Sequence, residues 1–179
     1  TEHKLNQLGE VKNIVRLGAF HGIDDPYYVN KFEVQFWSQP GGKTYTEPLI
    51  DIEIGIGGLT PTSDSEFFEF RGTNQPECAL LLKRGKGVLF TCDSVQNYSD
   101  YSFNNWLAKL VMPRIGFPKT TIIGPIWLRL MTPENKSLES EFERLLELKF
   151  DSLLSAHGTF LEQGAHKAVQ TAVRNTFSG

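Results

Sequence analysis

A run of strand-length apolar segments in the middle of the chain, with helical patterns on both sides, restricts the fold more than any other feature. From residue 49 to residue 93 the segments LIDIEIGI, EFFEFRG, ECALLLKR and GVLFTCD alternate or run apolar, and glycine-bearing turns separate them. We expect four consecutive strands here. A sheet with helical segments before and after it is covered by helices. The sequence therefore predicts a layered α/β or α+β sandwich, with residues 1–179 forming one domain.

The helical patterns lie at both ends of the chain. The first third predicts a short helix near residues 3–8, a strand over 11–17 and a helix opened by Pro26. After Asp93, the spacing of apolar residues predicts helices over 102–115, 137–148 and 162–177, with a strand over 150–158. Residues 124–127 (GPIW) are typical of a tight connection.

Charge and composition exclude several classes of partner. The net charge of −3, from 18 basic and 21 acidic residues, provides no field that would attract nucleic acid. The apolar runs are far shorter than the ~20 residues of a membrane-spanning helix. Two cysteines, Cys78 and Cys92, are too few for a disulfide framework or a four-thiolate zinc site, so we expect both in the core. We therefore expect a cytoplasmic protein that binds neither nucleic acid nor membrane.

The turn RGKG makes the last two predicted strands a hairpin and controls which residues face each other. If its loop consists of residues 84–86, Cys78 faces Cys92 and Glu77 faces Asp93. A different loop glycine would shift this register by one or two residues.

Ionisable residues gather where three apolar strands give way to loops. His21, Asp24 and Asp25 follow the first, Asp93 follows the second and His157 follows the third. Layered folds often collect ligands at such strand ends, and histidine with carboxylate is a ligand set of zinc, iron and manganese. Taken singly, each residue fits a turn, a helix cap or a loop contact with the backbone. The conjunction of the three strand ends is what predicts a metal site.

In this order and spacing, the three stretches resemble the metallo-β-lactamase superfamily. There, HxHxDH, a Gly-His pair, a strand-terminal GD and a late HG build a site for one or two metals. Here VLFTCDSV resembles the strand that delivers the bridging aspartate, and LELKFDSLLSAHGTF resembles the late segment. The resemblance covers about residues 5–177. It implies a four-layer αββα sandwich, shortened at its N-terminus, and hydrolysis of an ester, lactone, lactam, thioester or phosphodiester.

Departures from the family pattern reduce the expected site. HGIDDP keeps His21 and Asp25 but has Ile23 and Pro26 where two histidines would stand, and Thr73 replaces a third. The complete two-metal site uses five histidines and the chain contains four, so a full two-zinc site is excluded. One divalent zinc, manganese or iron ion could still bind. The candidate ligands are His21, Asp25, Asp93, His157 and, if the hairpin register holds, Glu77, with Asp25 as ligand or general base.

Two functions remain open from the sequence. The chain is either a metal-dependent hydrolase of an unknown small molecule, or an inactive binding or scaffold protein that retains the fold with a degenerate metal site. In such a site the surviving polar residues would hydrogen-bond one another. The shortened N-terminus would leave part of a sheet uncovered, so we expect a homodimer in which a second copy covers it.

Overall fold

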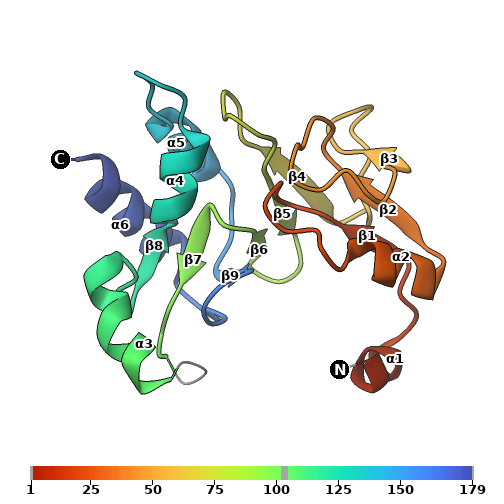
Figure 1. Ribbon diagram of the computed structural model, residues 1–179, viewed down its shortest axis with the longest axis horizontal. Helices are drawn as coiled ribbons and strands as arrows, with labels where there is room; N and C mark the ends of the chain where they lie inside the picture. Colours follow the sequence, from red (N-terminus) through yellow and green to blue (C-terminus); the bar gives the residue numbers. More distant parts are fainter. Residues whose placement is uncertain (1, 102–104, 179) are drawn as a thin grey trace.

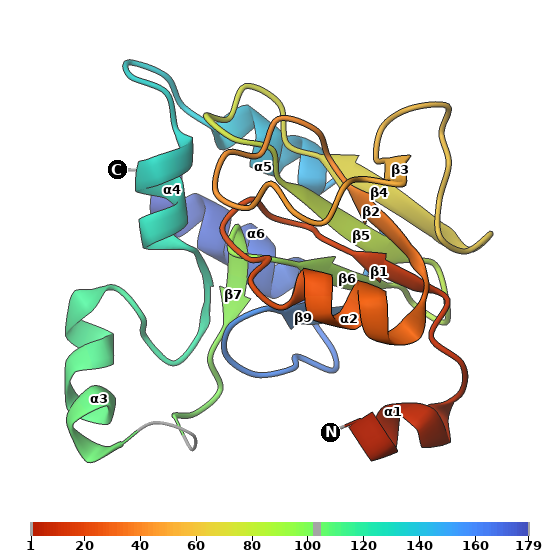
Figure 2. The ribbon, with the colours of Figure 1, turned by 45° about the vertical axis from the view of Figure 1, so that its right-hand side comes forward.

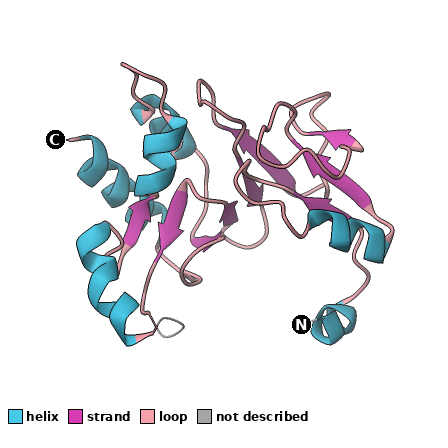
Figure 3. Ribbon diagram, viewed as in Figure 1, coloured by secondary structure: helices cyan, strands magenta, loops and turns pink. Residues whose placement is uncertain are grey.

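The computed structural model describes residues 2–101 and 105–178, and its strands lie between helices (Figures 1 and 3). The N-terminal part contains α1 (Glu2–Leu8), β1 (Asn13–Val15), α2 (Asp25–Phe32), β2 (Gln35–Ser38) and β3 (Ile52–Glu53). The middle contains β4 (Ser65–Glu69), β5 (Cys78–Leu82), β6 (Val88–Thr91) and β7 (Val95–Asn97). The C-terminal part contains α3 (Trp106–Val111), the 3-10 helix η1 (Met112–Ile115), β8 (Thr121–Ile123), α4 (Pro125–Met131), α5 (Glu139–Leu145), β9 (Ser152–Ser155) and α6 (Ala165–Phe177).

Two sheets pack face to face, and helices cover their outer sides. The first sheet has the order β1-β2-β3, with parallel neighbours. The second has the order β4-β5-β6-β9, in which β4, β5 and β6 are antiparallel and β9 runs parallel to β6. A short antiparallel pair, β7 and β8, accompanies it. In Figure 2, α2 lies in front of the first sheet, and α5 and α6 lie behind the second. This arrangement confirms the four-layer αββα sandwich.

Strand β5 shows how the sequence builds both interfaces. Its residues are apolar throughout, as expected for a strand with both faces covered. Cys78 belongs to the cluster between the sheets, with Trp37 and Ile54, whereas Ala79 and Leu81 belong to the larger cluster against the helices. Helix α6 contributes an apolar stripe to the same larger cluster. The stripe is formed by Ala165, Val169, Ala172 and Val173.

Several predicted boundaries were wrong. Regular α-helix in the stretch 105–115 is limited to Trp106–Val111, and a 3-10 turn follows at Pro113, which lacks a backbone N–H donor; residues 102–104 lie outside the described residues. In the segment 49–56, strand pairing is limited to Ile52–Glu53. Residues 125–127 form the first turn of helix α4, with Gly124 at the N-cap, rather than a connection, because Pro125 suits the first helical position.

The hairpin register was predicted correctly. Leu80 pairs with Phe90 and Leu82 with Val88, and this register, continued along the strands, places Glu77 opposite Asp93. Within residues 2–101 and 105–178, no helix has the length and hydropathy needed to cross a bilayer.

Candidate metal centre

The sheet topology explains why three distant loops meet. Because β6 and β9 run parallel, with Thr91 beside Ser155, the residues two positions further on, Asp93 and His157, leave the sheet at the same end. The segment before His21 joins them there because it pairs with the start of β5: the N–H of Cys78 donates to the carbonyl of Leu17 at 2.8 Å.

The glycine after His157 is required by its surroundings. Gly158 has a φ of +89°, and a Cβ at this position would stand 2.0 Å from the carbonyl oxygen of Asn97. This close approach holds the end of the His157 loop against β7, where Asn97 and Gly158 form a bridge. The late His-Gly pair of the sequence therefore has a physical basis in the backbone.

His21, Asp93 and His157 point their polar atoms at one another. His21 Nε2 lies 3.1 Å from Asp93 Oδ2, and His157 Nε2 lies 3.0 Å from Asp93 Oδ1. The two Nε2 atoms are 3.2 Å apart, with the rings tilted by 58°. The imidazoles are 47% and 45% exposed, whereas the Asp93 side chain is 13% exposed. A partly buried carboxylate thus lies below two accessible imidazoles.

The two histidines keep the Asp93 carboxylate charged. Burial by itself would raise the pKa of Asp93, but the hydrogen bond from His157 and the charge of His21 outweigh burial, and the pKa is lowered. In return, the hydrogen bond to Asp93 raises the pKa of His157. Asp93 is therefore an anion at neutral pH, the form that ligates a metal ion.

These three residues fit one metal ion. Their ligand atoms all lie within 4.8 Å of one another. Two nitrogens bound to one tetrahedral zinc at about 2.0–2.1 Å are separated by roughly 3.3 Å, close to the spacing of the two Nε2 atoms. Three protein ligands leave a coordination position open, as in catalytic sites, and two histidines with one carboxylate also suit iron(II).

Glu77 lies beneath this group and is not one of its converging side chains. It is fully buried, and its Oε1 accepts hydrogen bonds from the backbone N–H groups of Asp93 at 3.2 Å and Ser94 at 3.0 Å. Burial raises the pKa of Glu77 to about 8. Its other oxygen, Oε2, has no hydrogen-bond partner among the described residues. The geometry makes Glu77 a support for the Asp93 turn.

Asp25 also lies apart from the group, in an ion pair with Arg16. Arg16 Nε donates to Asp25 Oδ2 at 2.6 Å, and the same guanidinium donates to the carbonyls of Tyr45 and Glu47. It also stacks over the Phe36 ring at 4.9 Å. The pair ties the loop that carries His21 to residues 45–47. The structure thus brings together three of the five predicted ligands and places Asp25 and Glu77 in supporting positions.

Arg16 was not among the residues predicted from the sequence. Its side chain is 9% exposed. The signal was present: a lone arginine in the apolar stretch NIVRLGAF needs a nearby carboxylate or several carbonyls, because a buried cation is costly without partners. Of the residues expected to stand where the resemblance places histidines, Ile23 is exposed, and the Thr73 hydroxyl donates to the carbonyl of Gln75.

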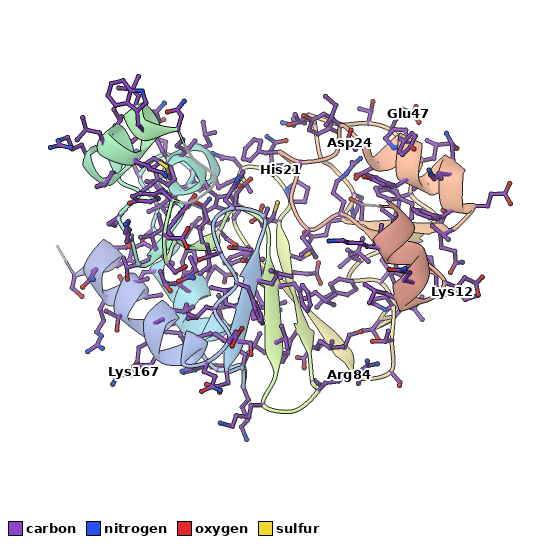
Figure 4. All side chains as sticks on the ribbon, turned by 90° about the horizontal axis from the view of Figure 1, so that it is seen from below. Lys12, His21, Asp24, Glu47, Arg84 and Lys167 are labelled. Atoms are coloured by element: carbon purple, nitrogen blue, oxygen red, sulfur yellow. The ribbon has the colours of Figure 1, made fainter. Side chains whose placement is uncertain are left out.

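A shallow depression of about 320 Å³ adjoins His21. Residues that line it include Gly18, Ile23, Asp24, Asp25 and Cys92. Among the described residues that line it, Arg16 is the one lysine or arginine, and Asp25 neutralises it. Figure 4 shows His21 and Asp24 at the same edge of the molecule, opposite the turn that carries Arg84.

Comparison with solved structures identifies the fold. A metallo-beta-lactamase from Pontibacter korlensis superposes with a TM-score of 0.56 at 15% identity, covering 98% of this chain and 74% of its own. An archaeal metallo-beta-lactamase superfamily protein from Sulfolobus tokodaii gives 0.58 at 14% identity, with 95% and 69% covered. Comparisons with family models and with curated proteins found no match. The chain therefore has the metallo-β-lactamase fold, with a sequence that has diverged far from those of these two proteins.

Proposed function

We propose that the chain is a hydrolase with one metal ion that acts on a neutral carbonyl compound: an ester, lactone or thioester. The observation that carries this proposal is the convergence of the two Nε2 atoms and the Asp93 carboxylate, with neighbouring contacts of 3.0–3.3 Å. Residues His21, Asp93 and His157 would hold the ion, and when bound it supplies Lewis acidity and activates water for hydrolysis.

Each of the three side chains has a separate task. As metal ligands, the imidazoles of His21 and His157 would each present the lone pair of Nε2, and the anionic Asp93 would supply the charge that favours a divalent cation. The exposed sides of the imidazoles face solvent and leave room for a substrate to approach. Asp25 is assigned to holding the His21 loop, because Arg16 occupies its carboxylate.

The charge of the depression favours a neutral substrate over a phosphodiester. Phosphate groups are usually bound by free arginine or lysine, or by helix N-termini. The Arg16 guanidinium is already used by Asp25 and two backbone carbonyls, and Asp24 adds negative charge nearby. An anionic diester would therefore meet no unpaired cation among the lining residues described.

The second candidate is a binding or scaffold protein that holds no metal. It is favoured by the direct contacts among His21, Asp93 and His157, because these polar atoms already satisfy one another. Metal content separates the two candidates.

The test begins with purified protein incubated separately with Zn²⁺, Mn²⁺ and anaerobic Fe²⁺, then desalted and analysed by mass spectrometry of the metals. We expect about one equivalent of one of the three metals; retention below about a tenth of an equivalent for all three would support the scaffold alternative. The control variant His166→Gln should retain metal, because His166 contacts the carbonyl of Leu146 in another part of the molecule.

The metal-loaded protein is then assayed with p-nitrophenyl acetate, a lactone, an acyl thioester and bis(p-nitrophenyl) phosphate. We expect kcat/KM for the best neutral substrate to exceed that for the phosphodiester by at least about tenfold. The opposite order would exclude the proposed substrate class while leaving the metal site intact.

A further inference from the structure

The segment formed by α3 and η1 (106–115) exposes an unusual amount of apolar surface. Trp106 is 78% exposed, and Leu107, Leu110 and Ile115 are each more than half exposed. Single exposed apolar residues are common, but several large ones within ten residues mark an interaction surface. In Figure 1, α3 projects at the lower left, beyond β7 and β8.

This surface lies in a stretch between Asp100 and Glu134 whose charged residues are all basic. From residue 101 to residue 133 the sequence contains four cations, Lys109, Arg114, Lys119 and Arg129, and no aspartate or glutamate, although the whole chain has a net charge of −3. Among the residues that the structure describes, neither Lys109 nor Arg114 forms an ion pair with a carboxylate. The cations on the segment are therefore available to a negatively charged partner.

The combination of charge and shape points to one occupant. If this segment packed on the same segment of a second copy across a two-fold axis, Lys109 and Arg114 would approach the same cations of the mate, which is unfavourable. A projecting segment with a tryptophan, leucines and cations has the composition of interfacial membrane contacts, and a bilayer accepts it without a complementary groove. Anionic headgroups attract the cations while the apolar side chains enter the acyl boundary.

We propose that the segment 106–115 docks on a membrane surface that contains anionic phospholipids. This is peripheral contact, and it revises the expectation from the sequence that the chain meets no membrane. In Figure 4, α3 lies at the same edge of the molecule as His21, opposite the turn that carries Arg84. Docking would therefore bring the candidate metal centre toward the lipid interface. The inference does not depend on the proposed hydrolase activity.

Tryptophan fluorescence offers a direct test because the three tryptophans differ in exposure. Trp37 and Trp127 are 5% and 2% exposed, so Trp106 dominates any change in solvent contact. The protein is titrated with vesicles of phosphatidylcholine alone and with vesicles that contain about a third phosphatidylglycerol. We expect a blue shift, and quenching by brominated acyl chains, with the anionic vesicles alone, and weaker binding as salt rises.

Two double variants in the segment, together with one control pair on α6, locate the contact. Lys109→Gln with Arg114→Gln should weaken binding to the anionic vesicles about thirtyfold, because each surface cation adds roughly a fivefold gain. The matched control, Lys167→Gln with Arg174→Gln, removes two cations from exposed positions of α6 and should weaken binding at most slightly. Leu107→Ser with Leu110→Ser should abolish the quenching by brominated lipids. Circular dichroism checks that each variant keeps its fold.

Three results would overturn the proposal. The first is equal binding to neutral and anionic vesicles, and the second is equal weakening by the α3–η1 and α6 pairs. The third is a concentration-dependent blue shift of Trp106 without vesicles, with a dimeric mass by light scattering, which would assign the surface to a second copy of the chain.

Discussion

The two halves of the candidate centre differ in what holds their polar groups. On one side, His21, Asp93 and His157 direct their ligand atoms at a common point, where these atoms contact one another, and leave two imidazoles open to solvent. On the other, Asp25 is neutralised by Arg16, whose remaining donors bind the carbonyls of Tyr45 and Glu47. A guanidinium with three acceptors therefore neutralises the carboxylate of the second half, whereas two imidazoles contact the carboxylate of the first. The difference teaches that neighbouring carboxylates in one region can be stabilised by quite different partners.

Replacing Asp93 should have the largest effect. Asp93→Ala removes the one anion among the three converging ligands, so we expect metal affinity to fall by on the order of a thousandfold, beyond the 10–100-fold typical of residues behind the ligands. Asp25→Ala should cost about tenfold or less, because it disturbs the His21 loop alone. Isothermal titration calorimetry measures both. Equal losses would show that the two halves bind metal together and would break the comparison.

Removing Arg16 should have the next largest effect, on stability. Arg16→Ala leaves Asp25 without its partner, and we expect the free energy of unfolding to fall by about 3 kcal/mol in urea titrations. The double variant Arg16→Met with Asp25→Leu should regain most of this loss, because no charge is then left unpaired. Metal stoichiometry should stay at one equivalent in both variants; uptake of a second equivalent by Arg16→Ala would show that the Asp25 half can also bind metal.

The support beneath Asp93 should be visible in the pH dependence of stability. In the folded protein burial raises the pKa of Glu77 to about 8, from an ordinary value of 4.5. Between these values the native state binds more protons than the unfolded chain, so stability falls as pH rises from about 5 to 8. Glu77→Gln cannot titrate. The difference between the parent and Glu77→Gln should therefore change by up to about 1.4 kcal/mol per pH unit in this window, to the disadvantage of the parent.

Urea titrations at several pH values between 5.5 and 8 provide the measurement. Nearby groups such as Asp93 and His157 titrate in both proteins, so their contributions largely cancel in the difference. A difference that stays constant with pH would mean that the Glu77 carboxylate is charged throughout this range.

The smallest expected effect is a change in the pKa of His157, within the half formed by His21, Asp93 and His157. Because the hydrogen bond to Asp93 raises the pKa of His157, Asp93→Asn should lower that pKa in metal-free protein. NMR titration of the His157 ring protons measures the change, with His166, on the far helix α6, as an internal reference. A His157 pKa that is the same in both proteins would indicate that the contact between His157 and Asp93 is not formed in solution.

Much of the fold could be predicted from local pattern, and the failures have local causes. The strands ECALLLKR and GVLFTCD and their register followed from apolar runs on both sides of a glycine turn, which are short-range signals. The strands Val95–Asn97 and Thr121–Ile123 were missed because each has three residues, too few to show a period. In the segment LIDIEIGI, strand pairing is limited to Ile52–Glu53. Alternation of apolar and polar residues therefore did not guarantee a neighbouring strand along the whole segment.

By itself, the sequence determined that three strand ends carry His21, Asp93 and His157, and that too few histidines remain for a two-zinc site, because residue types and counts do not depend on folding. The tertiary structure decided which carboxylates join them. Asp25, Glu77 and Asp93 are alike in sequence as acidic residues beside apolar stretches. Their roles diverge because Arg16 reaches Asp25 across nine residues and the backbone of Asp93 donates to Glu77 across sixteen. The hairpin register predicted that Glu77 faces Asp93. The atom that each carboxylate contacts depends on how side chains and loops pack in three dimensions, and the sequence pattern did not predict it.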